Sequence, residues 1–399
     1  MPGTPPILHW LLEDAAAAAP DRPAIELQGM ESTYRDLDQQ SNQLAQLVSD
    51  LGAEPGDTAL VFLPNRIEFV WLLFGLAKAG VIAALVDTEY RGEGLEHLIS
   101  SSDADIAFVD ADLLETFDTG VSGIADPPEE LVIVGTSGTD DPPEGVHTHG
   151  RLGNLMTDHP VDRPVAAQSV EPSDTLHLVH TSGTTGLPKW CRLSHAALVH
   201  QSRYWADIVG IRADDRVMNP LPLYHLNPLC LALYPAVSKR ATVVLSEEFS
   251  ASRFWDRVRE HDVTVLMLIF SVVDILLNQD VDDDRNDIRV MFPPNREFLD
   301  RFDIPAAAGL YGSTETAGAL TGRRFSRPFP DTDEALSQLA GWARPDVEIC
   351  ILDEDDERVP QGEIGEIACR PAKPDRLFDE YYNMPEETIA AIRNLWYHT

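Results

Sequence analysis

Residues 180–189 constrain the fold of this chain more than any other stretch, and they read HTSGTTGLPK. They follow the short apolar run 175–179, which we expect to be a buried strand, so the loop begins where a strand ends and backbone N–H groups can face an anion. Gly183 and Gly186 permit positive φ and close approach of the backbone, hydroxyl side chains add donors, and Lys189 supplies a positive charge. The stretch therefore predicts a loop that binds a polyphosphate.

Two other interpretations compete with this one. A run of Ser, Thr and Gly is by default an exposed turn, and a similar stretch at 135–139 leads into two aspartates at 140–141, which would repel phosphate. The loop is not a Walker A loop either. If the Walker A pattern is counted from Gly183, its second glycine falls at position 188 and its Mg²⁺-binding Ser or Thr at position 190. This chain has Pro188 and Trp190 there. We therefore expect a nucleotide chemistry other than that of the P-loop enzymes.

Further motifs follow the loop in a fixed order. They read LPLYH at 221–225, YGSTE at 311–315, and GEIGEI at 362–367 continuing to WYHT at 396–399. Shorter matches precede the loop: TYRDL at 33–37, GD at 56–57, LPN at 63–65 and KAG at 78–80. With these motifs, nearly the whole chain resembles the adenylate-forming superfamily, which includes acyl-CoA synthetases, nonribosomal-peptide adenylation domains and luciferases. Within it, the stretches 221–279 and 377–399 are most similar to crotonobetaine/carnitine-CoA ligases.

The resemblance implies an ATP site. An enzyme that activates an acid must bring a carboxylate oxygen to the α-phosphorus of ATP and neutralise the charge that spreads over the phosphates. The residues expected to hold the β- and γ-phosphates are Thr181, Ser182, Gly183, Thr184, Thr185, Gly186 and Lys189. Those expected around the adenine and the α-phosphate are Tyr311, Gly312, Ser313 and Thr314, with Glu315 as the Mg²⁺ ligand. Taken alone, Thr314 followed by Glu315 would rather indicate a helix N-cap.

His225 and Tyr224 are the expected substrate-binding residues. His225 lies in an otherwise apolar stretch, 220–233, where a core histidine with one backbone partner is the simpler interpretation. The resemblance places this position beside the reacting carboxylate, at the acid and pantetheine passages. His225, Thr314, Glu315 and Lys189 are therefore the expected catalytic residues. A betaine-like acid would want an aromatic box, for which Tyr204, Trp205 and Tyr224 are the candidate walls.

The element pattern predicts an α/β fold. It contains two mostly parallel sheets flanked by helices and a small β-barrel subdomain. Helical stretches such as 37–51 alternate with apolar runs such as 58–63 and 81–86, which is typical of βα units, and the rhythm returns after residue 175. The expected subdomains are 1–174, 175–340 and a β-rich part at 341–399, with residues 118–174 forming a long acidic, Pro- and Gly-rich surface connection.

The charge balance excludes some partners. A net charge of −36 is self-repulsive at low ionic strength and is largely screened at about 1 M salt, where the Debye length is about 3 Å. Only four of the 30 basic residues are lysines, which together with abundant aspartate is the pattern expected of a halophilic protein, with an ordinary acidic protein as the alternative. The charge disfavours nucleic acid and anionic membranes as partners.

The location expected from the sequence is a reducing cytoplasm. The longest apolar run, 69–86, contains Lys78 and two glycines, and we expect a helix followed by a strand there rather than a membrane span. The first residues lack the basic segment of a signal peptide. The four cysteines have neither CxxC pairing nor metal-ligand spacing, so reduced thiols are expected.

The end of the chain leaves two functions open. The sequence stops at Thr399, where the family normally continues into Gly-Asp and a small C-terminal catalytic domain. Either the chain is the large N-terminal domain of an ATP-dependent acyl-CoA synthetase, or it is a non-catalytic module that binds a nucleotide or an acyl-adenylate. The expected partners are a small carboxylic acid, ATP with Mg²⁺, coenzyme A and a second copy of the chain in a homodimer.

Overall fold

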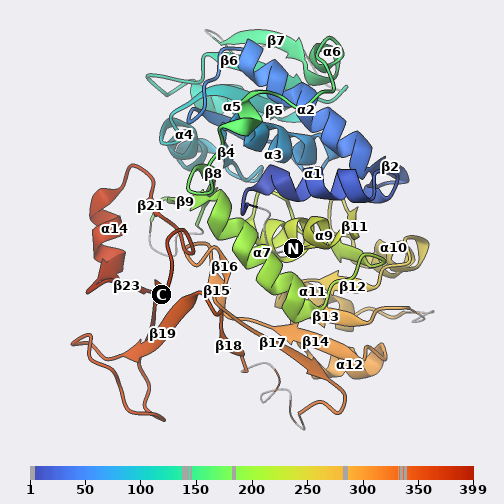
Figure 1. Cartoon of the computed structure of the whole chain (residues 1–399), viewed down its shortest axis with the longest axis vertical. Helices are drawn as coiled ribbons and strands as arrows, with labels where there is room; N and C mark the ends of the chain where they lie inside the picture. Colours follow the sequence, from blue (N-terminus) through green and yellow to red (C-terminus); the bar gives the residue numbers. More distant parts are fainter. Residues whose placement is uncertain are drawn as a thin grey trace.

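The structure is a computed structural model that describes residues 5–136, 143, 146–181, 186–281, 286–330, 332, 336 and 339–399. Two large sheets form the upper and lower parts of the molecule in Figure 1, and helices lie between and around them. Helix α1 (Leu8–Ala18) packs against α2 (Tyr34–Asp50) and α3 (Ile67–Ala79) of the upper part. It also packs against α7 (His195–Val209) and α9 (Tyr234–Lys239) of the lower part, so it joins the two.

The described residues of the upper part form an eight-stranded sheet. From edge to edge its strands are β21 (Glu380–Tyr381), β9 (Trp190–Ser194), β8 (Thr175–His180), β4 (Ile82–Leu85), β3 (Thr58–Phe62), β5 (Ala104–Asp110), β6 (Glu130–Val134) and β7 (His147–Arg151). Neighbours from β8 to β7 pair in parallel, whereas β9 and β21 are antiparallel additions. The central strands are buried along their whole length, as continuous apolar runs in a parallel sheet require.

The described residues of the lower part form a nine-stranded sheet. Its strands in order are β18 (Trp342–Ala343), β17 (Thr321–Ser326), β14 (Ala306–Gly309), β13 (Val290–Phe292), β12 (Val265–Met267), β10 (Arg216–Asn219), β11 (Thr242–Leu245), β1 (Pro23–Leu27) and β2 (Met30–Thr33). The strands from β14 to β1 pair in parallel, and the two ends are antiparallel. The predicted α/β fold with two mostly parallel sheets is confirmed.

The remaining helices connect and cover these sheets. They are α4 (Gly92–Ser100), α5 (Leu114–Val121), α6 (Leu152–Met156), α8 (Leu226–Pro228), α10 (Phe254–Glu260), α11 (Phe270–Leu277), α12 (Arg296–Arg301) and α14 (Pro385–Ala391). Short turns of other helix types are η1 (Ala111–Leu113), η2 (Ala166–Gln168), η3 (Leu229–Leu233) and η4 (Ala251–Arg253). Local chemistry sets several ends. Thr33 and Asp36 form a reciprocal capping box at the start of α2, and Gly80, with φ of 75°, ends α3.

The C-terminal part differs from the predicted β-barrel. Its described strands form an open four-stranded antiparallel sheet in the order β19 (Val347–Leu352), β20 (Glu366–Pro371), β23 (Trp396–His398) and β22 (Ile392–Arg393). A closed barrel requires hydrogen bonds between the two outer strands, and β19 and β22 are the edges here. A separate two-stranded hairpin, β15 (Gly312–Ser313) and β16 (Gly318–Ala319), lies above the lower sheet in Figure 1.

The two sheets do not follow the expected boundary at residue 174. The N-terminal hairpin β1–β2 belongs to the lower sheet, because β1 pairs in parallel with β11, and β8 and β9 belong to the upper sheet. The expected surface connection 118–174 contains two strands, β6 and β7, that extend the upper sheet. Apolar residues 131–134 are fully buried there, which outweighs the acidic and Pro-rich residues around them.

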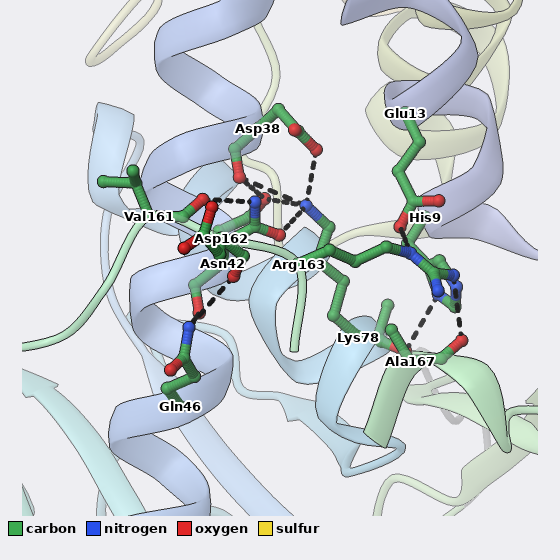
Figure 2. A network of polar contacts seen from close by, with 12 residues as sticks. His9, Glu13, Asp38, Asn42, Gln46, Lys78, Val161, Asp162, Arg163 and Ala167 are labelled. Atoms are coloured by element: carbon green, nitrogen blue, oxygen red, sulfur yellow. Dashed lines mark hydrogen bonds and ion pairs between the residues drawn. The ribbon is translucent and has the colours of Figure 1, made fainter. Parts of the chain in front are cut away.

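A buried lysine holds α2 against α3. Figure 2 shows Lys78, whose side chain is completely buried, pointing from α3 into a set of oxygen atoms on α2. Its Nζ donates to Asp38 Oδ1 at 2.6 Å, to Ser41 Oγ at 2.8 Å and to Asn42 Oδ1 at 2.6 Å. The Asn42 amide in turn donates to the carbonyl of Val161. These bonds satisfy a charge that would otherwise be very costly to bury.

The predictions for the apolar run and for the cysteines can be compared with this fold. The run 69–86 divides into the end of α3 and strand β4, as expected. Among the described helices, none is both long and apolar enough to cross a membrane. The four cysteines, 191, 230, 350 and 369, are all free and buried.

Candidate active site

The predicted phosphate loop follows the carboxyl end of β8 in the upper sheet and leads into β9. Its base is closed by a hydrogen bond from the Thr181 N–H to the Lys189 carbonyl at 2.9 Å. Ser182, Gly183, Thr184 and Thr185 lie outside the described residues. Gly186 is exposed but does not adopt the positive φ that the sequence suggested.

Trp190, the first residue after the loop, packs against α4. Its side chain is buried, and its indole N–H donates to the Leu98 carbonyl at 3.2 Å and to Ser101 Oγ at 3.1 Å. The bulky residue therefore anchors the start of β9 against the end of α4.

Lys189 lies over the ring of Tyr381. The distance from Nζ to the ring centroid is 4.7 Å, which is a cation–π contact. Tyr381 reaches this place because β21 pairs with β9 and puts it opposite Cys191, two residues after the lysine. An ion pair between Arg192 and Glu380, at 2.9 Å, supports the pairing.

The YGSTE motif forms the hairpin β15–β16. Residues 314–317 are its turn, so no helix begins here and the helix-cap interpretation is wrong. Thr316 Oγ1 accepts from the Ser313 N–H at 2.8 Å and donates to the Gly318 carbonyl at 2.6 Å. Gly312 is required for closure, because a Cβ there would lie 2.0 Å from the Gly318 oxygen. The motif thus holds Thr314 and Glu315 at the tip of a tight turn.

Glu315 is held from two sides. Its carboxylate accepts a hydrogen bond from the Tyr381 hydroxyl at 2.8 Å, and its carbonyl accepts from the Phe378 N–H at 2.8 Å. Tyr381 therefore contacts both Lys189 and Glu315, which come from separate motifs. Burial raises the pKa of Tyr381, and the neighbouring carboxylate of Glu315 raises it further, so the hydroxyl is the donor at neutral pH.

Tyr311 precedes this hairpin and is partly buried. Its hydroxyl hydrogen bonds with Thr399 Oγ1 at 2.7 Å, while its N–H donates to Thr321 Oγ1 at 3.0 Å. The ring hydroxyl and the backbone of Tyr311 are therefore both held in place, immediately before Gly312.

A cavity of about 270 Å³, called the smaller cavity below, lies beside the hairpin. Polar residues line it together with apolar ones. The lining consists of His180, His225, Leu226, Asn227, Cys230, Leu231, Leu310, Gly312, Ser313, Thr314, Gly318 and Ala319. The structure thus brings together His225 and Thr314, two residues that the sequence predicted for one site. The simpler core-histidine interpretation does not describe His225, whose side chain is 44% exposed.

Tyr224 lines a different cavity. This larger cavity, of about 1340 Å³, also contains Asn65, Arg66, Trp71 and Thr88 on its walls. The ring of Tyr224 lies 4.7 Å from the ring of His225, which lines the smaller cavity.

The predicted aromatic box for a betaine does not form. The side chain of Trp205 is fully buried against Phe292, and the Tyr204 hydroxyl donates to the Trp342 carbonyl. Neither residue lines the smaller cavity or the larger one, so Tyr224 has no second aromatic wall from this pair.

Burial keeps the histidines of this region neutral. It lowers the pKa of His180 to about 4, with the nearby His225 lowering it further. Burial also lowers the pKa of His225, against the opposing effect of Asp87, whose Oδ2 lies 4.0 Å from His225 Nε2. His195 and His200, which follow the loop in the chain, do not line the smaller cavity.

Sequence reasoning missed three residues of this region. Tyr381 stands in the C-terminal stretch that supported the family resemblance, but nothing in its local pattern points to Lys189. Asp87 lies just beyond β4, after Val86, and His180 is the last residue of β8, and these strands are parallel neighbours. A carboxylate and an imidazole at the same ends of two adjacent strands were the available signal.

Comparison with known proteins identifies the family and the fold of the chain. The family model described as AMP-binding enzyme matches residues 12–382. The crotonobetaine/carnitine–CoA ligase of Salmonella agona is 28% identical over 98% of this chain and 76% of that protein. The solved N-terminal domain of FACL13 from Mycobacterium tuberculosis has a TM-score of 0.82 at 22% identity, covering 98% of this chain and 95% of that one. A benzoate CoA ligase from Burkholderia xenovorans has a TM-score of 0.83 at 19% identity, covering 98% and 76%.

Proposed function

The chain belongs to the family of AMP-binding enzymes and is an ATP-dependent acid–CoA ligase of the AMP-forming class, and we propose that its chemistry takes place where Lys189, Thr314 and the smaller cavity meet. In the first step a carboxylate oxygen of the acid attacks the α-phosphorus of ATP, and the bond to pyrophosphate breaks. In the second, the thiol of coenzyme A attacks the acyl carbon and AMP leaves.

One observation carries the placement: Tyr381 contacts both Lys189 and Glu315, and the turn that carries Glu315 also lines the smaller cavity. An ATP molecule with its triphosphate at the loop and its α-phosphate at Thr314 would present the phosphorus to an acid in that cavity. Holding both reactants in this way removes most of the entropic cost of their meeting.

The residues fit a Mg²⁺ ion at Glu315. In the described part of the chain, its carboxylate receives one side-chain hydrogen bond, from Tyr381 to Oε1, which leaves Oε2 as a hard oxygen ligand. When bound with ATP, the ion would neutralise charge on the phosphate oxygens. Lys189 would add a second positive charge, which matters in a chain with a net charge of −36.

The two cavities suggest separate paths for the acid and for coenzyme A. The smaller cavity, at about 270 Å³, suits a small acid, and His225 is placed to contact its carboxylate. The larger cavity is lined by Tyr224, the neighbour of His225, and is large enough to admit the pantetheine arm of coenzyme A. A crotonobetaine- or carnitine-like acid stays a prediction from the resemblance, without support from an aromatic box.

The same proposal includes the conditions in which the enzyme works, a reducing cytoplasm and high salt. Four buried free thiols are compatible with a reducing cytoplasm, and the acidic, lysine-poor composition supports activity at high salt. The predicted homodimer stays a prediction.

The test combines binding and turnover. ATP binding in the presence of Mg²⁺ is measured by calorimetry, and acid-dependent ATP–pyrophosphate exchange is measured with short-chain acids. Lys189→Ala and Glu315→Gln should each weaken binding at least tenfold and lower exchange further. Lys239→Ala and Glu348→Gln, which remove surface ion pairs, should leave both unchanged. Unchanged ATP binding in the first pair of variants would refute the site.

A further inference from the structure

Three side chains outside the phosphate-binding residues form a cluster at the smaller cavity, which two of them line. Asp87, His180 and His225 each offer one ligand atom, and these atoms all lie within 4.8 Å of one another. They come from three separate places: the end of β4, the end of β8, and the segment before α8. His180 and His225 also line the smaller cavity.

His180 carries the strongest indication that this cluster binds something. The residue is only 5% exposed, yet in the described part of the chain neither of its ring nitrogens has a hydrogen-bond partner. Leaving such a group unsatisfied in a protein interior is costly. Its ring is held edge-on to Tyr90, at 5.4 Å, and to Trp190, at 5.9 Å, and neither neighbour satisfies its nitrogens.

Asp87 is oriented toward the same point. Its Oδ1 accepts a hydrogen bond from the Glu89 N–H at 2.8 Å, and Oδ2 lies 4.0 Å from His225 Nε2. This spacing is too long for a hydrogen bond. A tetrahedral ion with bonds of about 2.0–2.1 Å would hold neighbouring ligand atoms about 3.3 Å apart. The partly exposed His225 side chain can close that difference by a small rotation.

We propose that Asp87, His180 and His225 bind a divalent transition-metal ion of the Zn²⁺ type, with its open coordination position facing the smaller cavity. Two neutral imidazoles and one carboxylate suit zinc, cobalt or iron better than magnesium or calcium, which prefer oxygen ligands. Three protein ligands leave the open position that a catalytic metal site needs. If the acid binds in this cavity, which rests on the proposed function, its oxygen would be the fourth ligand.

The test measures metal binding directly and needs no turnover. A second cluster, Glu130 with His147 and His149, also has ligand atoms close enough to hold a metal, so the parent protein carries His147→Gln and His149→Gln to remove its contribution. It is stripped with a chelator and titrated with Co²⁺ at about 1 M salt, which screens the acidic surface. Calorimetry and visible absorption should show one bound Co²⁺, displaced by Zn²⁺.

Variants in the parent background decide the ligands. Asp87→Asn, which keeps the side-chain shape, and His180→Gln should each weaken Co²⁺ binding at least tenfold, since loss of outer-shell partners alone costs about 10–100-fold. His200→Gln, outside the cluster, should bind Co²⁺ like the parent. Circular dichroism confirms folding of each variant. Absence of a bound Co²⁺ in the parent, or equal affinity in the Asp87→Asn variant, would overturn the metal site. ATP binding is measured separately, without Co²⁺. Normal ATP binding would leave the proposed function standing whether or not the metal site is overturned.

Discussion

Removing one hydroxyl, by Tyr381→Phe, tests how the two nucleotide motifs are connected. The variant keeps the ring beneath Lys189, 4.7 Å from Nζ, and loses the 2.8 Å hydrogen bond to Glu315. A hydrogen bond to a charged group contributes about 1.5–3 kcal/mol. Because Glu315 is only half-buried, we use the lower end of this energy range. A free-energy difference of about 1.4 kcal/mol corresponds to a tenfold change in an equilibrium constant. We expect Mg²⁺·ATP to bind about tenfold more weakly, measured by calorimetry.

The neighbouring tyrosine provides the matched control. Tyr382 donates its hydroxyl to Asp103 at 3.2 Å, away from the phosphate loop, so Tyr382→Phe should change ATP affinity less than twofold. Tyr381→Leu, which also removes the ring from Lys189, should cost about 0.5–1 kcal/mol more than Tyr381→Phe. Wild-type affinity in Tyr381→Phe, or an equal loss in Tyr382→Phe, would refute the idea that this hydroxyl positions Glu315.

Three other changes test the fold around the site. Gly312→Ala places a Cβ 2.0 Å from a facing carbonyl oxygen and should abolish Mg²⁺·ATP binding in calorimetry, whereas Gly153→Ala, which meets no atom within 4 Å, should not. Lys78→Met should lower the free energy of unfolding in urea by about 3 kcal/mol, which is the lower end of the cost of breaking a buried ion pair. Lys239→Met, which breaks a surface ion pair, should lower it by less than about 1 kcal/mol. Equal losses in the two variants would contradict this. Burial lowers the pKa of His177 to about 3, below its unfolded value of about 6.5, so the folded protein excludes a proton that the unfolded chain binds. Stability should therefore fall by about 2 kcal/mol from pH 6.5 to pH 5 through this residue, and urea titrations of His177→Gln should show a flatter pH dependence.

The sequence locates the candidate site in short contiguous segments, and the ligand-binding roles of their residues stay predictions. The loop at 180–189 is contiguous. The strand before it, its glycines and its lysine indicate polyphosphate binding without reference to other parts of the chain. The same holds for Thr314 and Glu315, because the hairpin that presents them is closed by Thr316 and Gly312 within the motif. Local backbone requirements are visible in residue types, so such segments can be interpreted before the fold is known.

The sequence did not predict the order of strands in the two sheets. Residues 23–33 precede the upper sheet in the chain, yet β1 pairs with β11, more than 200 residues later. Buried apolar strands look alike in sequence, and pairing depends on which of them meet across the molecule. The expected boundary at 174 followed chain order for this reason, as did the expectation of a long surface connection at 118–174.

Tyr381 shows why such pairing matters for the chemistry. It stands on a two-residue edge strand, held to β9 by backbone hydrogen bonds from Asp379 and Tyr382 on either side of it. Lys189 and Glu315 are therefore linked through an element whose position depends on sheet pairing, and no property of either motif specifies that pairing. Short edge strands open at lower free energy than central ones. The link between the phosphate loop and the Glu315 hairpin should accordingly be the first part of the site to be lost when the fold is weakened, while Thr314 and the smaller cavity persist.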